Sequence, residues 1–410
     1  MSTQLSGEVL RSLTAKSNVP LVFRGFVKNW PVCDWNSEKW CSVFGDKEIP
    51  FRCLKRDLVS DEPCWERKCS LKSMTFKTFI ESLDNSDEWM YFDYKYLHQW
   101  FGADTELSKA VSWKDFGYPD KGAPETTLWV GSEGAHTPAH QDTYGFNIVA
   151  QIHGTKRWIL FPPETGGLKP TRVPYEESSV YSELNFYCPN NLDVFNGITG
   201  GRMVELSAGD ALLVPRGWWH YVQNTDRLNI TLNIWLPHDR DGTTRVSEAL
   251  IKIFVAQICK DLPQETAKLL VNPNEDDIAD TPLAVLFLQL ETVANMYLDN
   301  RRKSRRVKRQ KTCDDDTSAP VLEEYDLRTL LENEVNNLEI VPNISSDDLV
   351  SLVRQNLKEY AKSNGSLEDD EVDGSTASLC LTKAVIDAFS QGNVIELVKQ
   401  NLLTRLSHSY

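Results

Sequence analysis

The strongest constraint on this chain is a run of short apolar segments between Thr127 and Trp235. The segments read TLWVG, FNIVAQIHG, KRWILFPP, RMVELSAGDALLVPRGWWHYVQN and LNITLNIWLP. Turn signals separate them, and Gly209 with Asp210 marks a further turn inside the fourth segment. Many short strands at this spacing indicate a sandwich or barrel rather than a sheet of alternating strands and helices.

The regions on either side of this run differ in pattern. Upstream, Leu21 to Phe23 is predicted to be a strand, and the aromatic-rich stretch EWMYFDYKYL is β-prone. After Pro237, apolar residues recur at helical spacing, which predicts a helix. Its apolar positions are Leu250, Ile253, Phe254 and Ile258.

The carboxy-terminal region is predicted to contain three amphipathic helices. The first carries Leu327, Leu330, Leu331, Val335 and Leu338, and the second carries Leu349, Val353, Leu357 and Tyr360. Ser345 and Asp348 resemble a capping box at the start of the second helix. The third begins after Thr382 and is expected to break at Gly392 and Asn393.

Two segments are predicted to be loose. NRRKSRRVKRQKTCDDDTSAP is basic and then acidic, and SNGSLEDDEVDGSTAS is polar, so neither has much to bury. We therefore divide the chain into a β domain with amino-terminal elements (1–262), a helical extension (263–298), a charged flexible linker (299–320) and a helical region (321–410). The basic run Arg301 to Lys311 fits a solvated loop better than a nuclear-import signal or an RNA-binding patch.

Composition narrows the functional class. The net charge of −15 disfavours unspecific binding to nucleic acid phosphates. The nine cysteines show no CxxC spacing, which indicates a reducing compartment, either cytoplasm or nucleus. No apolar run is long enough to span a bilayer, and MSTQLSGEVLRSLTAKSNVP lacks the apolar centre of a secretion signal.

His140 and Asp142, in TPAHQD, form a His-x-Asp motif. On a strand, residues i and i+2 point to the same face, so both side chains can reach one ion. A second histidine would complete the two-His, one-carboxylate set of non-haem Fe(II) oxygenases, and His220 in PRGWWHYV is the obvious source. The motif alone is weak, because such a pair also occurs on ordinary surface strands.

The surroundings of this motif resemble the JmjC (jumonji C) family of Fe(II)- and 2-oxoglutarate-dependent oxygenases. The resemblance lies in LWVGSEGAHTPAHQD, NIVAQIHGTKRWILFPPE, LSAGDALLVPRGWWHYVQN, NITLNIW and the upstream VPLVFRGFVKNWP. Several motifs occur in the family's order, which makes the match specific. The resemblance implies a mainly β core with added helices, a double-stranded β-helix (cupin-like jelly roll), followed by a carboxy-terminal helical region.

The resemblance also implies the site. The iron ligands would be His140, Asp142 and His220. The 2-oxoglutarate-binding positions would be Lys156, Thr137, Tyr91, Asn147 and Asn233. Lys156 would pair with the distal carboxylate of the cosubstrate, Thr137 and Tyr91 would add hydroxyl hydrogen bonds, and the asparagines would lie near its inner carboxylate and the metal.

Physical chemistry agrees with these roles, because a buried dicarboxylate needs a cation at one end and a metal at the other. Each residue also has a simpler interpretation. Lys156 would be solvated in a plain hairpin, and a core asparagine usually bonds to backbone. Tyr94 and Tyr96 are rivals of Tyr91, because strand register is uncertain. The Asn147 match depends on one apparent extra residue after Asp142.

Other conspicuous residues have no assigned chemistry. His136 and His153 have no evident partner, so we interpret them as structural or exposed. Trp218 and Trp219 are expected to form walls. The apolar carboxy-terminal helices fit either a homodimer face or packing on their own barrel.

The expected activity is 2-oxoglutarate-dependent hydroxylation of a protein side chain; an RNA base suits the acidic chain less well. Within the JmjC family, YFDYKYL, PTRVPYEESSVYS and GAHTPAHQD resemble a branch that associates with small heat shock proteins, which implies such a partner and a stress-related role. The alternatives are a catalytically silent scaffold that binds a small heat shock protein, and a cupin holding Zn²⁺ or Mn²⁺.

Overall fold

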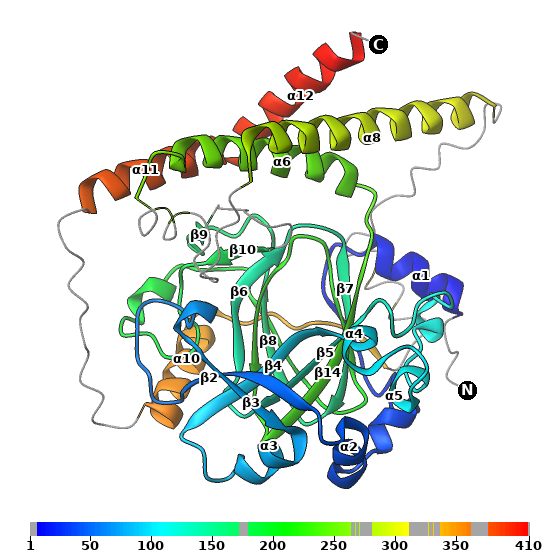
Figure 1. Ribbon diagram of the computed structural model, residues 1–410, viewed down its shortest axis with the longest axis vertical. Coiled ribbons are helices and arrows are strands. Elements are labelled where there is room, and N and C mark those ends of the chain that lie inside the picture. Colours follow the sequence, from blue (N-terminus) through cyan, green and yellow to red (C-terminus); the bar gives the residue numbers. More distant parts are fainter. Residues whose placement is uncertain are drawn as a thin grey trace.

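Two antiparallel β-sheets form the centre of the computed structural model, which describes residues 6–171, 179–263, 281–310, 337–361 and 376–408, with single residues 267, 270, 327 and 331 (Figure 1). Among these residues the larger sheet has nine strands in the order β15-β1-β12-β7-β14-β5-β4-β2-β3. The smaller has six in the order β11-β8-β13-β6-β10-β9. Strands distant in sequence lie side by side, which confirms the predicted jelly-roll core.

The strand bounds follow the predicted apolar segments closely. The larger sheet contains β1 (Leu21–Phe23), β2 (Glu48–Lys55), β3 (Ser70–Thr75), β4 (Glu88–Tyr96), β5 (Thr126–Ser132), β7 (Phe146–His153), β12 (Ala211–Val214), β14 (Leu228–Leu236) and β15 (Leu338–Ile340). The smaller sheet contains β6 (His136–Asp142), β8 (Lys156–Phe161), β9 (Pro170–Thr171), β10 (Ser179–Ser182), β11 (Arg202–Leu206) and β13 (Trp219–Asn224).

The α-helices come from the chain before β5 and from the chain after β14. They are α1 (Gly7–Lys16), α2 (Ser37–Phe44), α3 (Phe76–Ser82), α4 (Leu97–Phe101), α5 (Glu106–Lys109), α6 (Asp241–Cys259), α8 (Leu283–Gln310), α10 (Ser346–Tyr360), α11 (Thr376–Phe389) and α12 (Gly392–His408). Short 3₁₀ turns occupy Pro31–Asp34, Glu66–Lys68, Lys114–Phe116 and Asp193–Phe195.

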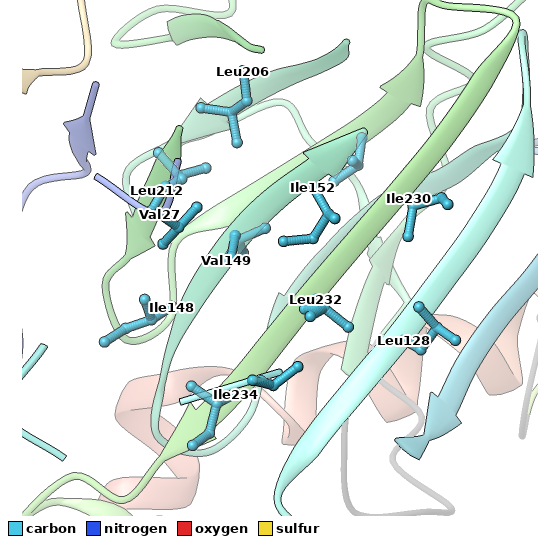
Figure 2. Packing of buried hydrophobic residues seen from close by; sticks show 14 of the residues in the cluster. Val27, Leu128, Ile148, Val149, Ile152, Leu206, Leu212, Ile230, Leu232 and Ile234 are labelled. Atoms are coloured by element: carbon cyan, nitrogen blue, oxygen red, sulfur yellow. The ribbon is translucent and has the colours of Figure 1, made fainter. Parts of the chain in front are cut away.

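Alternation along β14 explains how one strand serves both a core and a cavity. Ile230, Leu232 and Ile234 are fully buried in the main apolar cluster, which Figure 2 shows together with Leu128 and Ile148 from the neighbouring strands. The intervening residues of β14 point to the opposite face, between the two sheets. Truncating Ile230 or Ile234 to alanine would lower the free energy of unfolding by about 2–5 kcal/mol.

The amino-terminal elements cover the outer face of the larger sheet. Trp40 and Phe44 of α2 and Phe76 of α3 are buried in the same cluster as the sheet residues. The rings of Phe44 and Phe76 stack with centroids 4.3 Å apart. This layer buries one side of the sheet and leaves the inter-sheet face for polar groups.

Residues 337–360 belong to the barrel and its covering layer. Leu338–Ile340 forms β15, which pairs with β1, so Leu338 lies in a strand and not in the predicted helix. The predicted N-cap is confirmed, because the Ser345 hydroxyl accepts a hydrogen bond from the Asp348 backbone N–H; the Asp348 carboxylate in turn accepts from that hydroxyl over 2.6 Å. Leu349 and Val353 of α10 pack on the smaller sheet.

Helices α6, α8, α11 and α12 form a layer across one end of the barrel (Figure 1). The predicted linker is corrected in its first part: 299–310 continue α8, and 311–320 lie outside the described residues. The last predicted helix also begins earlier, at Thr376. It does break, but at Ser390 and Gln391, and the predicted break residues Gly392 and Asn393 begin α12. Most of the second loose segment, like most of the helix predicted around Leu330, lies outside the described residues.

Candidate metal centre and cosubstrate cavity

His140 and His220 lie directly opposite each other on adjacent strands, β6 and β13 of the smaller sheet. Their ring centroids are 4.1 Å apart. The Nε2 atom of His140 lies 3.8 Å from Asp142 Oδ1, and that of His220 lies 4.0 Å from Asp142 Oδ2. Ligand atoms of the three residues lie within 4.8 Å of one another, a spacing that one metal ion can bridge.

Each imidazole is held through its other ring nitrogen. His140 Nδ1 lies 2.9 Å from the Pro138 carbonyl oxygen, and His220 Nδ1 lies 3.0 Å from that of Trp218. A carbonyl only accepts, so Nδ1 carries the proton and Nε2 keeps its lone pair. This is the arrangement that orients histidine towards a metal. Burial, reinforced by His220, lowers the pKa of His140 well below its usual value, which keeps the imidazole neutral.

Asp142 is held from the opposite sheet. Its Oδ2 accepts a hydrogen bond of 2.9 Å from the indole N–H of Trp235, and the Asn147 side chain also bonds to it. Burial raises the pKa of Asp142, while the neighbouring His220 and these two hydrogen bonds lower it. A cation beside the carboxylate would offset the cost of its burial. A donor set of two imidazoles and one carboxylate fits Fe(II).

Lys156 is buried at the start of β8, with only 3% of its surface exposed. Its ammonium donates to the phenol oxygen of Tyr91 over 3.1 Å, and the described residues give it no ion-pair partner. Burial lowers the pKa of Lys156 to about 7, and the nearby Asp93 raises it slightly. The solvated-hairpin interpretation is therefore wrong. A buried ammonium of this kind suits an anionic ligand.

Tyr91 is the tyrosine that enters the cavity, rather than Tyr94 or Tyr96. Its side chain also forms a hydrogen bond with Thr137, and burial raises its pKa. Gly131 on the adjacent strand makes room for the ring, because a Cβ there would lie 2.7 Å from Tyr91 Cδ2. Thr137, Tyr91 and Lys156 thus present two hydroxyls and an ammonium to one point.

Asn147 and Asn233 belong to one hydrogen-bond network. Asn233 Nδ2 donates to Asn147 Oδ1 over 2.9 Å, and Asn233 Oδ1 accepts from the Trp129 indole over 2.7 Å. Asn147 in turn bonds to Asp142. These amides therefore bond to side chains of the site, and the structure places Asn147 there despite its uncertain match.

One cavity between the two sheets joins these groups. All the predicted site residues except Asp142 line it, and Asp142 borders it through His140 and Trp235. The further lining residues are Trp129, Val149, Trp158, Val222, Thr231 and Trp235. Sequence reasoning missed these walls, although Thr231 and Trp235 follow from alternation with Asn233 on one strand.

The remaining conspicuous residues lie away from this cavity. His136 is buried and stacks on Tyr187 with centroids 4.3 Å apart, while His153 is half-buried. Burial lowers the pKa of His136 to about 4. Trp218 and Trp219 are buried in the two apolar clusters, where they act as walls of the cores and not of the cavity. Tyr94 is exposed and packs against Trp235.

Two facing antiparallel sheets that enclose a His-Asp-His cluster define a cupin-type jelly roll with a candidate metal centre. The chain belongs to the cupin-like domain family, whose pattern matches residues 8–242. The resemblance to JmjC proteins is confirmed by the relatives that the chain matches. Among the helices of the described residues, none combines the length and apolarity needed to cross a membrane.

Three relatives illustrate the match. Human HSPB1-associated protein 1 is 38% identical over 302 residues, which cover 70% of this chain and 61% of that protein. The zebrafish HSPB1-associated protein 1 homolog is 36% identical over 318 residues, covering 73% of this chain and 70% of that protein. Lysine-specific demethylase JMJ30 of Arabidopsis thaliana is 25% identical over 236 residues, 55% and 51% of the two chains. The chain thus spans less than two thirds of the human relative's length.

Proposed function

We propose that this protein is an Fe(II)- and 2-oxoglutarate-dependent oxygenase. The observation that carries the proposal is the pairing, around one cavity, of a convergent His-Asp-His cluster with a buried lysine that has no ion-pair partner among the described residues. A dicarboxylate that chelates a metal at one end and meets an ammonium at the other matches this arrangement.

In this proposal His140, Asp142 and His220 hold the iron and leave its other positions open. A metal bound there would support an oxidation in which 2-oxoglutarate loses CO₂ and becomes succinate with one atom of O₂, while the other atom enters a C–H bond of the substrate. The chain supplies orientation and exclusion of water. Asn147 and Trp235 fix Asp142 through hydrogen bonds, and the apolar lining keeps the cavity dry.

Lys156, Thr137 and Tyr91 bind the distal carboxylate of 2-oxoglutarate in this scheme. A charged ammonium with two hydroxyls gives charge-assisted hydrogen bonds, which are about twice as strong as neutral ones. Tyr91 already bonds to both partners, so little rearrangement is needed. Asn233 bonds to Asn147, which bonds to Asp142. These two amides would therefore orient the end of 2-oxoglutarate that chelates the metal.

The test is an anaerobic titration of the apoprotein with Fe(II) and then 2-oxoglutarate, following the visible metal-to-ligand charge-transfer band. We expect a band in the wild type, no band in His140→Ala, and a much higher 2-oxoglutarate requirement in Lys156→Ala. His153→Ala is the matched control, because His153 lies outside the cavity. Absence of the band in folded wild-type protein would contradict the proposal. Metal analysis of anaerobically purified protein tests the alternative of a Zn²⁺ or Mn²⁺ cupin.

We propose a protein side chain as the substrate. The acidic chain disfavours an RNA base, and the demethylase activity in the name of the Arabidopsis relative concerns that protein. Mass spectrometry of peptides from cells with wild-type protein or His140→Ala measures this directly. We expect a peptide that gains one oxygen atom only with the wild type. No such peptide across the proteome would argue against this substrate.

The relatives' names also motivate a partner, the small heat shock protein HSPB1. We propose that this chain binds a small heat shock protein, as a regulated partner or as the substrate. A pull-down with purified HSPB1 tests it, with the His140→Ala/Asp142→Ala variant alongside. Equal capture by both forms, without any oxygenase signal, would favour a silent scaffold; no capture would remove this partner.

A further inference from the structure

Trp235 connects the two sheets at the candidate metal centre. It lies near the end of β14 in the larger sheet, and its indole N–H donates to Oδ2 of Asp142, in the smaller sheet, over 2.9 Å. The ring of Trp235 lines the cavity. It is therefore both a wall of the cavity and a donor to the carboxylate of the cluster.

Two side chains, the Trp235 indole and Asn147, hold the carboxylate of Asp142 in one orientation through hydrogen bonds. The terminal torsion of an aspartate side chain has a broad distribution, so packing alone defines it poorly. Asp142 is also the last residue of β6, before a turn. The indole fixes one oxygen, while Oδ1 faces His140 and Oδ2 faces His220.

Tyr94 supports the indole from outside. Its ring packs on that of Trp235 with centroids 5.4 Å apart and on Trp129 at 5.9 Å. Tyr94 lies where β4 shifts register against β5, and its φ of 53° is a left-handed conformation that bulky residues rarely adopt. Such backbone strain persists only where surrounding contacts compensate for it. The strained residue at this irregularity of β4 places its ring against Trp235.

We propose that Trp235 is a positioning residue for the metal: its indole N–H fixes the Asp142 carboxylate towards the two imidazoles, and Tyr94 holds the indole in place. The inference rests on the proposed function, because it needs a metal at the cluster. It adds a residue that donates to a ligand and does not itself bind the metal.

Anaerobic titration of apoprotein with Co(II) tests this role without turnover. Co(II) is redox-stable under these conditions, and its visible spectrum reports its coordination. Trp235→Phe keeps the aromatic volume and removes the N–H; we expect binding weakened by about 10–100-fold and an altered spectrum. Trp113→Phe is the matched control, because its buried indole donates to Thr126 Oγ1 over 2.9 Å, outside the cavity, and it should bind Co(II) like the wild type.

Trp235→Gln separates positioning from packing. Glutamine is smaller but offers an N–H, so it should recover part of the affinity and the wild-type spectrum. A glutamine variant as weak as phenylalanine would overturn the role of the hydrogen bond. Tyr94→Ala should weaken binding in the same direction but less, and an unchanged affinity would remove Tyr94 from the proposal.

The outcomes also separate this inference from the proposed function. If the wild type binds no Co(II), both fail. If the wild type and Trp235→Phe bind Co(II) equally, with the same spectrum, only the role of Trp235 fails.

Discussion

The ammonium of Lys156 donates a hydrogen bond to the phenol oxygen of Tyr91 across 3.1 Å, although the two residues belong to different sheets. Both side chains are buried. Without this hydrogen bond the buried ammonium of Lys156 would face apolar side chains. The phenol therefore provides a polar contact for the ammonium in the absence of a bound anion. Under the proposed function, this relationship predicts that cosubstrate binding depends on pH and on the tyrosine hydroxyl.

Binding of 2-oxoglutarate should weaken as pH rises above 7. The cosubstrate needs the charged ammonium, and burial lowers the pKa of Lys156 to about 7. Below that pH the lysine is already protonated, whereas above it binding must take up a proton. We expect the Kd to rise on the order of tenfold per pH unit above 7. The charge-transfer titration, repeated between pH 6.5 and 8.5, measures it.

The control for this pH dependence is Lys156→Arg. A guanidinium stays charged across the range, so its Kd should be nearly constant with pH even if its fit is poorer. A wild-type Kd that does not change between pH 7 and 8.5 would contradict the assignment of Lys156 as the cosubstrate cation.

Tyr91→Phe should weaken 2-oxoglutarate binding while leaving Fe(II) binding intact. The change removes the hydroxyl that bonds to Lys156 and Thr137, a loss of about 1 kcal/mol or roughly fivefold in Kd. Tyr118→Phe is the control, because its hydroxyl lies 3.0 Å from that of Thr14, outside the cavity. Equal cosubstrate affinity in both variants would exclude Tyr91 from the binding site.

Arg52→Met should destabilise the larger sheet. Arg52 and Asp93 are both buried, and Arg52 Nε lies 3.0 Å from Asp93 Oδ2. Removing the cation leaves a buried carboxylate, at a cost of about 3 kcal/mol in the free energy of unfolding. Urea denaturation measures this. The double variant Arg52→Met/Asp93→Leu should recover much of the loss, and a double variant no more stable than the single one would refute the ion-pair explanation.

Asn356→Ala should loosen α10 from the barrel. Asn356 Nδ2 donates to Gln223 Oε1 of β13 over 2.9 Å, and both amides are buried. The alanine removes this partner of Gln223, whose Oε1 still accepts from the Tyr221 hydroxyl over 3.2 Å, so we expect a loss of about 1 kcal/mol. Gln355→Ala, at an exposed position of the same helix, should change stability little. Hydrogen exchange in 346–360 distinguishes local loosening from global unfolding; unchanged protection in Asn356→Ala would contradict the prediction.

Local patterns explain what could be predicted for the site. His140 and Asp142 share a face because they are two residues apart on one strand, and this needs no knowledge of the fold. His220 was proposed because the set needs a second histidine, and Lys156 came from the family resemblance; nothing in their own segments says which strands become neighbours. The indole of Trp235 was missed for the same reason: its partner Asp142 belongs to the other sheet.

Two segments show where local patterns mislead. Leu338 continues the helical spacing of apolar residues, yet it forms a strand, because pairing with Phe23 of β1 gives its backbone groups partners. The basic run from Arg301 has little to bury, yet 301–310 continue α8. The helix is already nucleated by its buried part, so each added residue needs only propagation.

The sequence by itself determined the β core, the helical regions at its end, the shared face of His140 and Asp142 and, through motif order, the family. Periodicity and turn chemistry are local, so they can be read along one chain. The tertiary structure decided that His220 lies opposite His140, that Tyr91 rather than Tyr94 meets Lys156, and that α10 packs on the barrel. These are pairings between distant segments, fixed only when the sheets close and exclude water from the groups between them.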